Sequence, residues 1–147
     1  MIRTERGIEQ QGILKAPVAV LMSTRVVQML RDIPLREAQK VTDRYDFNCF
    51  PVVGPEGRLV GVLSKGDLLR AAREAAIDRS VWDQPVATWM AHGVLALRPQ
   101  DSVAIAAELM IESGRRSLPV IDDDDYVVGM VSRNDLIQAL KPGNPHP

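Results

Sequence analysis

The sequence predicts a mixed fold of the α/β or α+β class, assembled from two copies of one β-α-β-β-α unit. Apolar residues make up 46% of the 147 residues and aromatic residues only 4%, which indicates a sizeable aliphatic core. Residues 61–69 (GVLSKGDLL) combine the apolar end of a strand with the polar start of a helix. Nearly the same phrase, GMVSRNDLI, returns at residues 129–137. An internal repeat at this period indicates a duplicated supersecondary unit.

The duplication extends over most of the chain, because residues 18–72 align with residues 86–140 without a gap. Identical residues gather at the strand–helix junctions, among them the pairs Val18/Val86, Pro51/Pro119, Gly61/Gly129, Ser64/Ser132 and Asp67/Asp135. A copy of roughly 55 residues buries so little surface that it would be only marginally stable alone. We therefore expect the two copies to pack sheet against sheet as a pseudo-twofold pair.

The first half of the first copy follows a short polar segment. Residues 1–15 are polar and mixed in charge, and they predict a flexible arm or a short helix. Residues 17–23 predict a short helix, because Pro17 in the first turn loses no helical hydrogen bond. Residues 26–30 are a β-prone run. Residues 34–45 repeat apolar side chains at spacings of three and four, which predicts an amphipathic helix.

The rest of the first copy predicts a hairpin and a helix. The apolar runs 50–53 and 59–63 are joined by Gly-Pro-Glu-Gly, which is typical of a turn. Ser64 lies where a helix N-cap belongs, and the following helix extends to Ala76. Residues 77–85 predict a polar connector.

The second copy repeats the same order of elements. We expect its short helix at residues 86–90, its first strand at 94–97 and its amphipathic helix at 103–113. The hairpin strands are expected at 118–121 and 127–131, and the last helix at 133–140. Ser102 and Ser132 are the expected N-caps, and Gly114 is the expected left-handed residue that ends the amphipathic helix. Residues 142–147 are expected to be a frayed tail.

Composition excludes several classes of protein. The formal net charge is −1 and no basic block stands out, so a general nucleic-acid surface is not expected. No run of 18 apolar residues is long enough to span a membrane, and no secretory h-region begins the chain. Cys49 is the single cysteine, so no disulfide forms within one chain. A reducing compartment, the cytoplasm, suits this composition.

The repeated Ser-x-x-Asp pattern has two chemical interpretations. A carboxylate can accept two hydrogen bonds from the vicinal diol of a ribose. The neighbouring helix N-terminus carries unpaired N–H groups and a partial positive charge, which favours a phosphate. The alternative is a capping box, in which the acid accepts a hydrogen bond from the N–H of the cap residue. Asp67 and Asp135 are therefore candidate ligand contacts or candidate caps.

Other polar residues divide between a function and a structural role. Arg115 and Arg116 are phosphate ligands or a solvated helix exit, with Arg116 the better candidate. Lys65 and Arg133 lie in a first helical turn, which a cation does not favour, and this hints at an anionic neighbour. The four acids of residues 122–125 match the hairpin turn of the first copy, so we interpret them as a solvated turn and predict no metal site.

The duplicated unit resembles the CBS domain, and the pair is similar to a tandem CBS module, also called a Bateman module. The resemblance rests on Pro-Val in the middle strand and on Gly-h-h-Ser-x-x-Asp (h is apolar) at the last junction, found twice in register. It assigns residues 16–76 to the first CBS repeat and residues 86–141 to the second. The resemblance implies that adenosine-containing ligands bind in clefts between the two repeats: AMP, ADP, ATP, S-adenosylmethionine or NAD.

The resemblance also assigns ligand contacts at matching positions. Asp67 and Asp135 match the aspartate that binds ribose, and Ser64 and Ser132 match the Ser or Thr that helps to hold phosphate or ribose. The residues around the Pro-Val strand of the second copy complete the expected site: Arg116, Ser117 and Pro119. The first copy has Asn48 and Cys49 where relatives place basic residues, which puts phosphate binding there in doubt. His92 precedes the second copy's first strand, in a region that can touch the base.

The expected function is that of a regulatory module without chemistry of its own. Ligand binding would change packing and act on an unidentified partner protein. The resemblance implies dimerisation through helices, so a homodimer is expected, with Ala71, Ala72, Ala75, Ala76 and the helix of residues 103–111 as candidate surface. The alternative is a dimerisation or interaction scaffold that is indifferent to nucleotides. No nucleophile with its base, no metal motif and no glycine-rich phosphate loop is present, so the sequence does not predict an enzyme.

Overall fold

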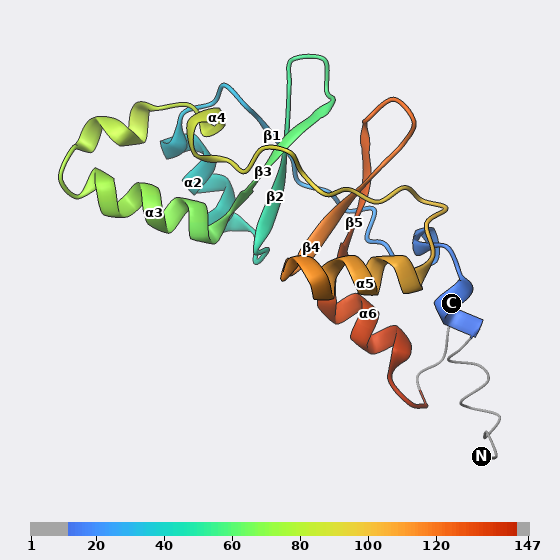
Figure 1. Cartoon of the computed structure of the whole chain (residues 1–147). Coiled ribbons are helices and arrows are strands. Elements are labelled where there is room, and N and C mark those ends of the chain that lie inside the picture. Colours follow the sequence, from blue (N-terminus) through green and yellow to red (C-terminus); the bar gives the residue numbers. More distant parts are fainter. Residues whose placement is uncertain (1–11, 144–147) are drawn as a thin grey trace. The chain divides into compact units, whose positions relative to one another are not determined.

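The computed structural model describes residues 12–143, which divide into two compact units of mixed helix and strand (Figure 1). One unit, here the first-repeat unit, comprises residues 27–95 with residues 124–126. The other, the second-repeat unit, contains residues 96–123 and the segments before residue 27 and after residue 126. The expected mixed fold class is confirmed. The ends of the expected arm and tail, residues 1–11 and 144–147, lie outside the described residues.

The first-repeat unit contains a three-stranded sheet with the order β1-β2-β3. Its strands and main helices are β1 (Met29–Leu30), α2 (Leu35–Arg44), β2 (Cys49–Val53), β3 (Leu59–Ser64) and α3 (Lys65–Ala75). β1 pairs with β2 in parallel, and β2 pairs with β3 as an antiparallel hairpin. Leu35, Phe50 and Leu63 are fully buried in its aliphatic core.

The second-repeat unit repeats this plan with a smaller sheet. Its elements are α5 (Val103–Ser113), β4 (Ser117–Ile121), β5 (Val127–Ser132) and α6 (Arg133–Leu140). β4 and β5 form an antiparallel hairpin, and the register shifts at Val120/Ile121, which matches the shift at Val52/Val53 in the first hairpin. Ser102 caps α5 and Gly114 ends it with φ of 71°, so both expected caps are confirmed.

The first strand of each copy is shorter than predicted. The run 26–30 forms only β1, and the run 94–97 forms no strand but a single parallel bridge between Leu97 and Val120. The reason lies at Pro99, which has no N–H to donate to β4. At the equivalent position of the first copy, the N–H of Arg31 donates to the carbonyl of Val53 at 2.9 Å and so completes the pairing of Leu30 with Val53. The second chain segment therefore turns away from its sheet one residue earlier.

The short helices are exchanged between the sequence repeats and the compact units. The short helix η1 (Val18–Val20) begins the first repeat, yet Val18 is fully buried in the core of the second-repeat unit. The equivalent helix α4 (Val86–Trp89) belongs to the core of the first-repeat unit. The N–H of Val18 donates to Asp101 at 2.7 Å, and that of Val86 donates to Ile33 at 2.9 Å. Each unit is therefore completed by a segment from the other repeat.

The connector of residues 77–85 is more ordered than its polarity suggested. It contains η2 (Arg79–Asp83), a short 3-10 helix in which Val81 is buried and Trp82 packs against the core. Arg36 on α2 pairs with Asp83, and this ion pair ties the connector to the unit. Asp78 caps η2, and hydrogen bonds from the hydroxyl and N–H of Ser80 hold the pKa of its carboxyl below its usual range. The residues predicted as a polar connector therefore also contribute one buried valine to the core.

The described part of the N-terminal arm is also structured. Residues 12–15 are helical, and Ile13 is buried with 5% of its surface exposed. The arm therefore contributes an apolar anchor to the second-repeat unit. Of the four alanines expected to offer a dimer surface, Ala71 and Ala75 are buried in the core of the first-repeat unit and are not available to a second chain. Ala72 is half-buried and Ala76 is exposed.

Candidate functional site

The junction between β3 and α3 holds the first Ser-x-x-Asp pair. The hydroxyl of Ser64 accepts a hydrogen bond from the N–H of Asp67 at 3.1 Å. Asp67 Oδ2 in turn accepts the N–H of Ser64 at 2.8 Å, which completes a capping box. Asp67 is a buried acid, with 6% of its surface exposed. The capping interpretation of this motif is therefore confirmed for one oxygen of the carboxylate.

The junction between β5 and α6 has the same geometry. Ser132 accepts the N–H of Asp135 at 3.1 Å, and Asp135 Oδ2 accepts the N–H of Ser132 at 2.8 Å. Each aspartate is thus fixed in orientation by the start of its own helix. This local geometry follows from the sequence, because Ser at the N-cap and an acid three residues later is the pattern that closes such a box.

The second carboxylate oxygen distinguishes the two junctions. Asp67 Oδ1 accepts a hydrogen bond from the guanidinium of Arg70 at 2.8 Å. Asp135 Oδ1 has no partner among residues 12–143, and Asp135 is partly exposed. A carboxylate oxygen that is held in place but not used can accept a hydrogen bond from a ligand hydroxyl.

The residues at the start of β2 and of β4 lie beside these caps. Ser117 pairs directly with Ser132 across the β4–β5 hairpin, as Cys49 pairs with Ser64 across β2–β3. The carbonyl of Arg116 accepts the N–H of Arg133 at 2.8 Å, which places Arg116 next to the start of α6. Arg116 is exposed, and its guanidinium has no partner within residues 12–143. The structure therefore groups Arg116, Ser117, Ser132 and Asp135 at one junction.

The cations in the first helical turns have structural partners. Arg133 donates to the carbonyls of Gly114 at 2.8 Å and Arg115 at 3.2 Å, where α5 ends. The carbonyls at a helix C-terminus carry partial negative charge, so they are a favourable partner for a guanidinium. Lys65 lies 3.7 Å from the carboxylate of Asp46. Lys65 thus has an anionic neighbour and Arg133 has carbonyls of partial negative charge, both supplied by the chain itself.

Pro119 and His92 occupy different environments. Pro119 is buried inside β4, and its carbonyl accepts the N–H of Leu97 at 2.9 Å. His92 follows Ala91, which bridges to Val62 on β3 of the first-repeat unit. Contact of either residue with a ligand stays a prediction.

Sequence reasoning missed the segments that cross each junction. Ser23 and Met130 exchange hydrogen bonds of 2.8 and 2.9 Å, and Ala91 and Val62 do the same at 2.9 and 3.1 Å. These crossings explain the repeated glycines of the motif. A Cβ on Gly129 would lie 2.6 Å from Met22 Sδ, and one on Gly61 would lie 2.7 Å from the carbonyl oxygen of Ala91. Glycine at the same position of both repeats was the feature of the sequence that could have predicted a close approach of another backbone segment.

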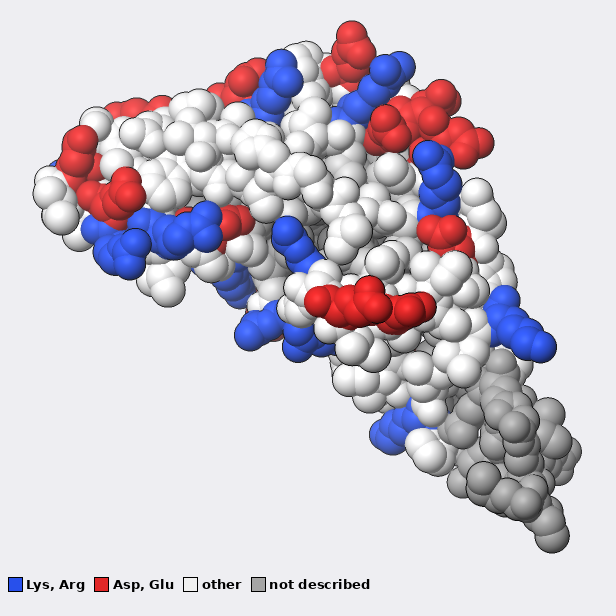
Figure 2. All heavy atoms as spheres, in the orientation of Figure 1, with Lys and Arg blue, Asp and Glu red and all other residues white. Residues whose placement is uncertain are grey.

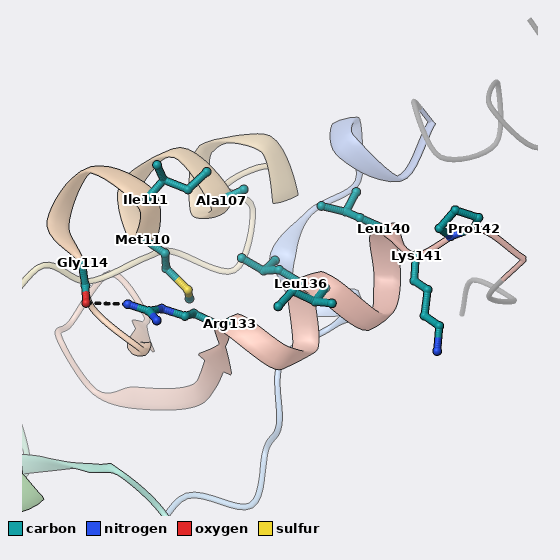
Figure 3. Close-up of a pocket in the computed structure, with 10 residues that line it drawn as sticks. Ala107, Met110, Ile111, Gly114, Arg133, Leu136, Leu140, Lys141 and Pro142 are labelled. Atoms are coloured by element: carbon teal, nitrogen blue, oxygen red, sulfur yellow. Dashed lines mark hydrogen bonds between the residues drawn. The ribbon is translucent and has the colours of Figure 1, made fainter.

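An apolar groove lies between α5 and α6 in the second-repeat unit, with a volume of about 620 Å³ (Figure 3). Met110 reaches from α5 toward α6, and Leu136 and Leu140 line the facing side (Figure 3). Ile111 and Ile137 beside it are 81% and 59% exposed. The corresponding groove between α2 and α3 has Thr42 and Asp43 where α5 has Met110 and Ile111, and Trp82 of η2 also lines it. The two repeats therefore present different helical faces.

Charge and metal chemistry add little to the site. On the face drawn in Figure 2, basic and acidic side chains are interspersed and form no broad field of one sign. Within residues 12–143, no group of three or more His, Cys, Asp or Glu side chains is arranged to hold a metal ion. In the same residues, no helix has the length and apolar character needed to cross a membrane.

Comparison with known proteins supplies the context for this geometry. The family model described as "CBS domain" matches residues 18–74 and again residues 86–142. The CBS domain of a CBS domain-containing membrane protein from Sphaerobacter thermophilus is 27% identical, with a TM-score of 0.77 over 92% of this chain and 94% of that one. CBSX2, solved in complex with AMP, is 25% identical, with a TM-score of 0.75 over 84% of this chain and 95% of that one.

Curated relatives vary widely in length. An uncharacterized 17.7 kDa protein of Acidianus ambivalens is 28% identical over 84% of this chain and 72% of its own length. Other relatives are much longer, and this chain spans 15% of one and 30% of another.

Proposed function

This chain belongs to the CBS domain family as a tandem pair, and we propose that it is a regulatory module that binds an adenosine-containing ligand. The proposal rests on the geometry of the junction between β5 and α6. There, Asp135 is fixed by its capping bond while its other oxygen has no partner among the described residues. In this proposal that oxygen accepts a hydrogen bond from a ribose hydroxyl.

Arg116 supplies the second half of the proposed recognition. It is exposed at the start of α6, and its guanidinium is not used by any residue in the described part of the chain. A guanidinium binds phosphate by paired hydrogen bonds, and the N-terminus of a helix favours the same charge. Ser117 and Ser132 lie between the two groups and offer hydroxyls. A ribose with one 5′-phosphate, as in AMP, therefore fits the chemistry of these residues.

The comparison with CBSX2 supports this ligand class. That protein was solved with AMP, and it shares 25% identity and the fold with this chain. Among the expected ligands, AMP is therefore the first probe, followed by ADP, ATP, S-adenosylmethionine and NAD. The ligand would act on a partner protein, and it can do so only by binding one arrangement of the module better than another. We place this activity in the cytoplasm, because the single cysteine Cys49 suits a reducing compartment.

Calorimetric titration tests the proposal. AMP is titrated into the wild-type chain and into Asp135→Asn, Arg116→Gln and Glu108→Gln. The asparagine keeps a capping oxygen but loses the charge, so we expect affinity to fall on the order of 10- to 100-fold. Arg116→Gln should weaken AMP but leave adenosine binding nearly unchanged, since adenosine has no phosphate. Glu108→Gln removes an exposed acid of α5 and should bind as the wild type does. Equal AMP affinity in all four proteins would contradict the proposal.

A second candidate function is a scaffold that is indifferent to nucleotides. It is favoured by the capping boxes, which already employ Asp67 and Asp135 structurally. The apolar groove between α5 and α6 would then be its working surface. The titration separates the two functions, because a scaffold would bind none of the five probes while retaining its oligomeric state.

A further inference from the structure

The guanidinium of Arg70 binds the carboxylate oxygen of Asp67 that the helix cap does not use. Asp67 Oδ2 accepts the N–H of Ser64 at 2.8 Å, and Oδ1 accepts the Arg70 guanidinium at 2.8 Å. The Asp67 side chain is 8% exposed, whereas that of Arg70 is 58% exposed. Both oxygens of this carboxylate are therefore engaged inside the first-repeat unit before any ligand arrives.

The second repeat lacks this arrangement because it has a different residue in the same register. Gln138 follows Asp135 by three positions, as Arg70 follows Asp67. Its amide nitrogen lies 3.5 Å from Asn134 Oδ1, one turn back along α6. Gln138 carries no charge that would attract it to Asp135, and Asp135 Oδ1 has no partner within residues 12–143. A single substitution between the repeats thus changes the state of the acid.

We propose that Arg70 closes the first repeat's site by occupying the oxygen that a ribose hydroxyl would use, which leaves Asp135 as the working acid. This inference rests on the proposed function. A ligand at Asp67 must first displace a charge-assisted hydrogen bond. Because Arg70 is largely exposed, solvent screens the ion pair, and its removal should strengthen binding by roughly three- to tenfold.

A missing cation reinforces the difference. The position equivalent to Arg116 is Asn48, which cannot neutralise a phosphate. A site reopened at Asp67 should therefore prefer a ligand without a phosphate. Adenosine is the appropriate probe for the first repeat, and AMP for the second.

The test uses the full chain with Asp135→Asn, so that the second site is weakened and a gain in affinity reports on the first. Adenosine is titrated into this variant alone and into the same variant carrying Arg70→Gln or Arg73→Gln. Arg70→Gln should raise adenosine affinity roughly three- to tenfold. Arg73→Gln removes an equal charge from an exposed position on α3 and should have no effect. The reciprocal change Gln138→Arg, in an otherwise wild-type chain, should lower AMP affinity by a similar factor.

The outcomes separate the inference from the proposed function. If wild-type binding is lost with Asp67→Asn and kept with Asp135→Asn, ligand binding stands and the inference fails. If Arg70→Gln leaves affinity unchanged or lowers it, Arg70 does not compete with the ligand, and the inference again fails alone. If no variant binds adenosine or AMP, the proposed function fails and this inference fails with it.

Discussion

The two aspartates occupy the same helix cap but differ in the hydrogen-bonding capacity that the cap leaves over. A carboxylate has two oxygens, and a capping box uses only one of them. At Asp135 the other oxygen is unused within the described residues, whereas at Asp67 it is paired with Arg70. Capping and ligand binding are therefore not competing interpretations of the motif. In the proposed function, the cap fixes the orientation of the Asp135 carboxylate before a ligand binds.

Residue-scale reasoning from the sequence succeeded where the chemistry is local. The capping boxes of Ser64 with Asp67 and of Ser132 with Asp135 were predicted because such a box depends only on residues three positions apart. The crossing of Met22 over Gly129 could not be predicted, since it joins residues that are distant in the sequence. The role of Arg70 was within reach, because comparing it with Gln138 in the repeat register exposes the difference.

The glycines of the repeated motif give a prediction at this scale. Gly61→Ala should destabilise the protein by about 1–3 kcal/mol, because the new Cβ would press against a backbone oxygen at 2.7 Å. Gly129→Ala should cost less, since its nearest backbone oxygen, that of Ser23, is 3.1 Å away and Met22 is flexible. Urea denaturation followed by circular dichroism measures both changes.

Gly66→Ala is the matched control for these substitutions. This glycine lies in the first turn of α3, and its Cβ would be 3.5 Å from the nearest atom, Ser64 Oγ. We expect it to raise stability by about 0.5–1 kcal/mol, as removal of a helical glycine does. A Gly61→Ala variant as stable as Gly66→Ala would show that the crossing segment is not held where the structure has it.

At the scale of elements, helix boundaries were predicted best and edge strands worst. The bounds of α5 were predicted to the residue because Ser102 and Gly114 mark both ends. The strand expected at residues 94–97 formed only a single bridge, because Pro99 has no N–H to donate to β4, whereas Arg31 at the equivalent position of the first copy donates to Val53. An apolar run in the sequence predicts that a segment is buried. The tertiary structure decides which neighbouring segment forms hydrogen bonds with its backbone. η2 was missed for the same reason, since Val81 alone is buried in it.

The end of α5 yields the prediction at the element scale. Gly114 has φ of 71°, and a Cβ there would meet nothing within 4 Å, so backbone conformation alone decides the cost. Gly114→Ala should lower the free energy of unfolding by about 1–2 kcal/mol. Gly114→Asn should cost clearly less, because asparagine tolerates the left-handed region. Chemical denaturation measures both variants, and equal losses for Ala and Asn would point to a steric cause instead.

At the scale of the whole molecule, sequence repeats and compact units have different boundaries. Val18 and Val86 are each fully buried in the unit built mainly from the other repeat. An alignment of the chain with itself detects the repeat but cannot tell which copy of a short helix packs where. Neither unit keeps a complete core if the chain is cut between residues 76 and 86, since each would lose a buried valine. Single repeats should therefore be poor substitutes for the pair in any experiment.

The two helical faces give the last prediction, on self-association. Ile111 and Ile137 flank the apolar groove between α5 and α6, and a second copy would remove them from water. We expect the wild-type chain to be a dimer in sedimentation equilibrium, and Ile111→Lys with Ile137→Lys to be a monomer. The lysines remove apolar surface from the groove, and they also place positive charge beside Arg133 and Lys141. Both effects oppose association. Leu69→Lys is the matched control, because Leu69 is 71% exposed at the position equivalent to Ile137, in the more polar groove. Loss of the dimer with Leu69→Lys but not with the double substitution would place the interface on α2 and α3 instead.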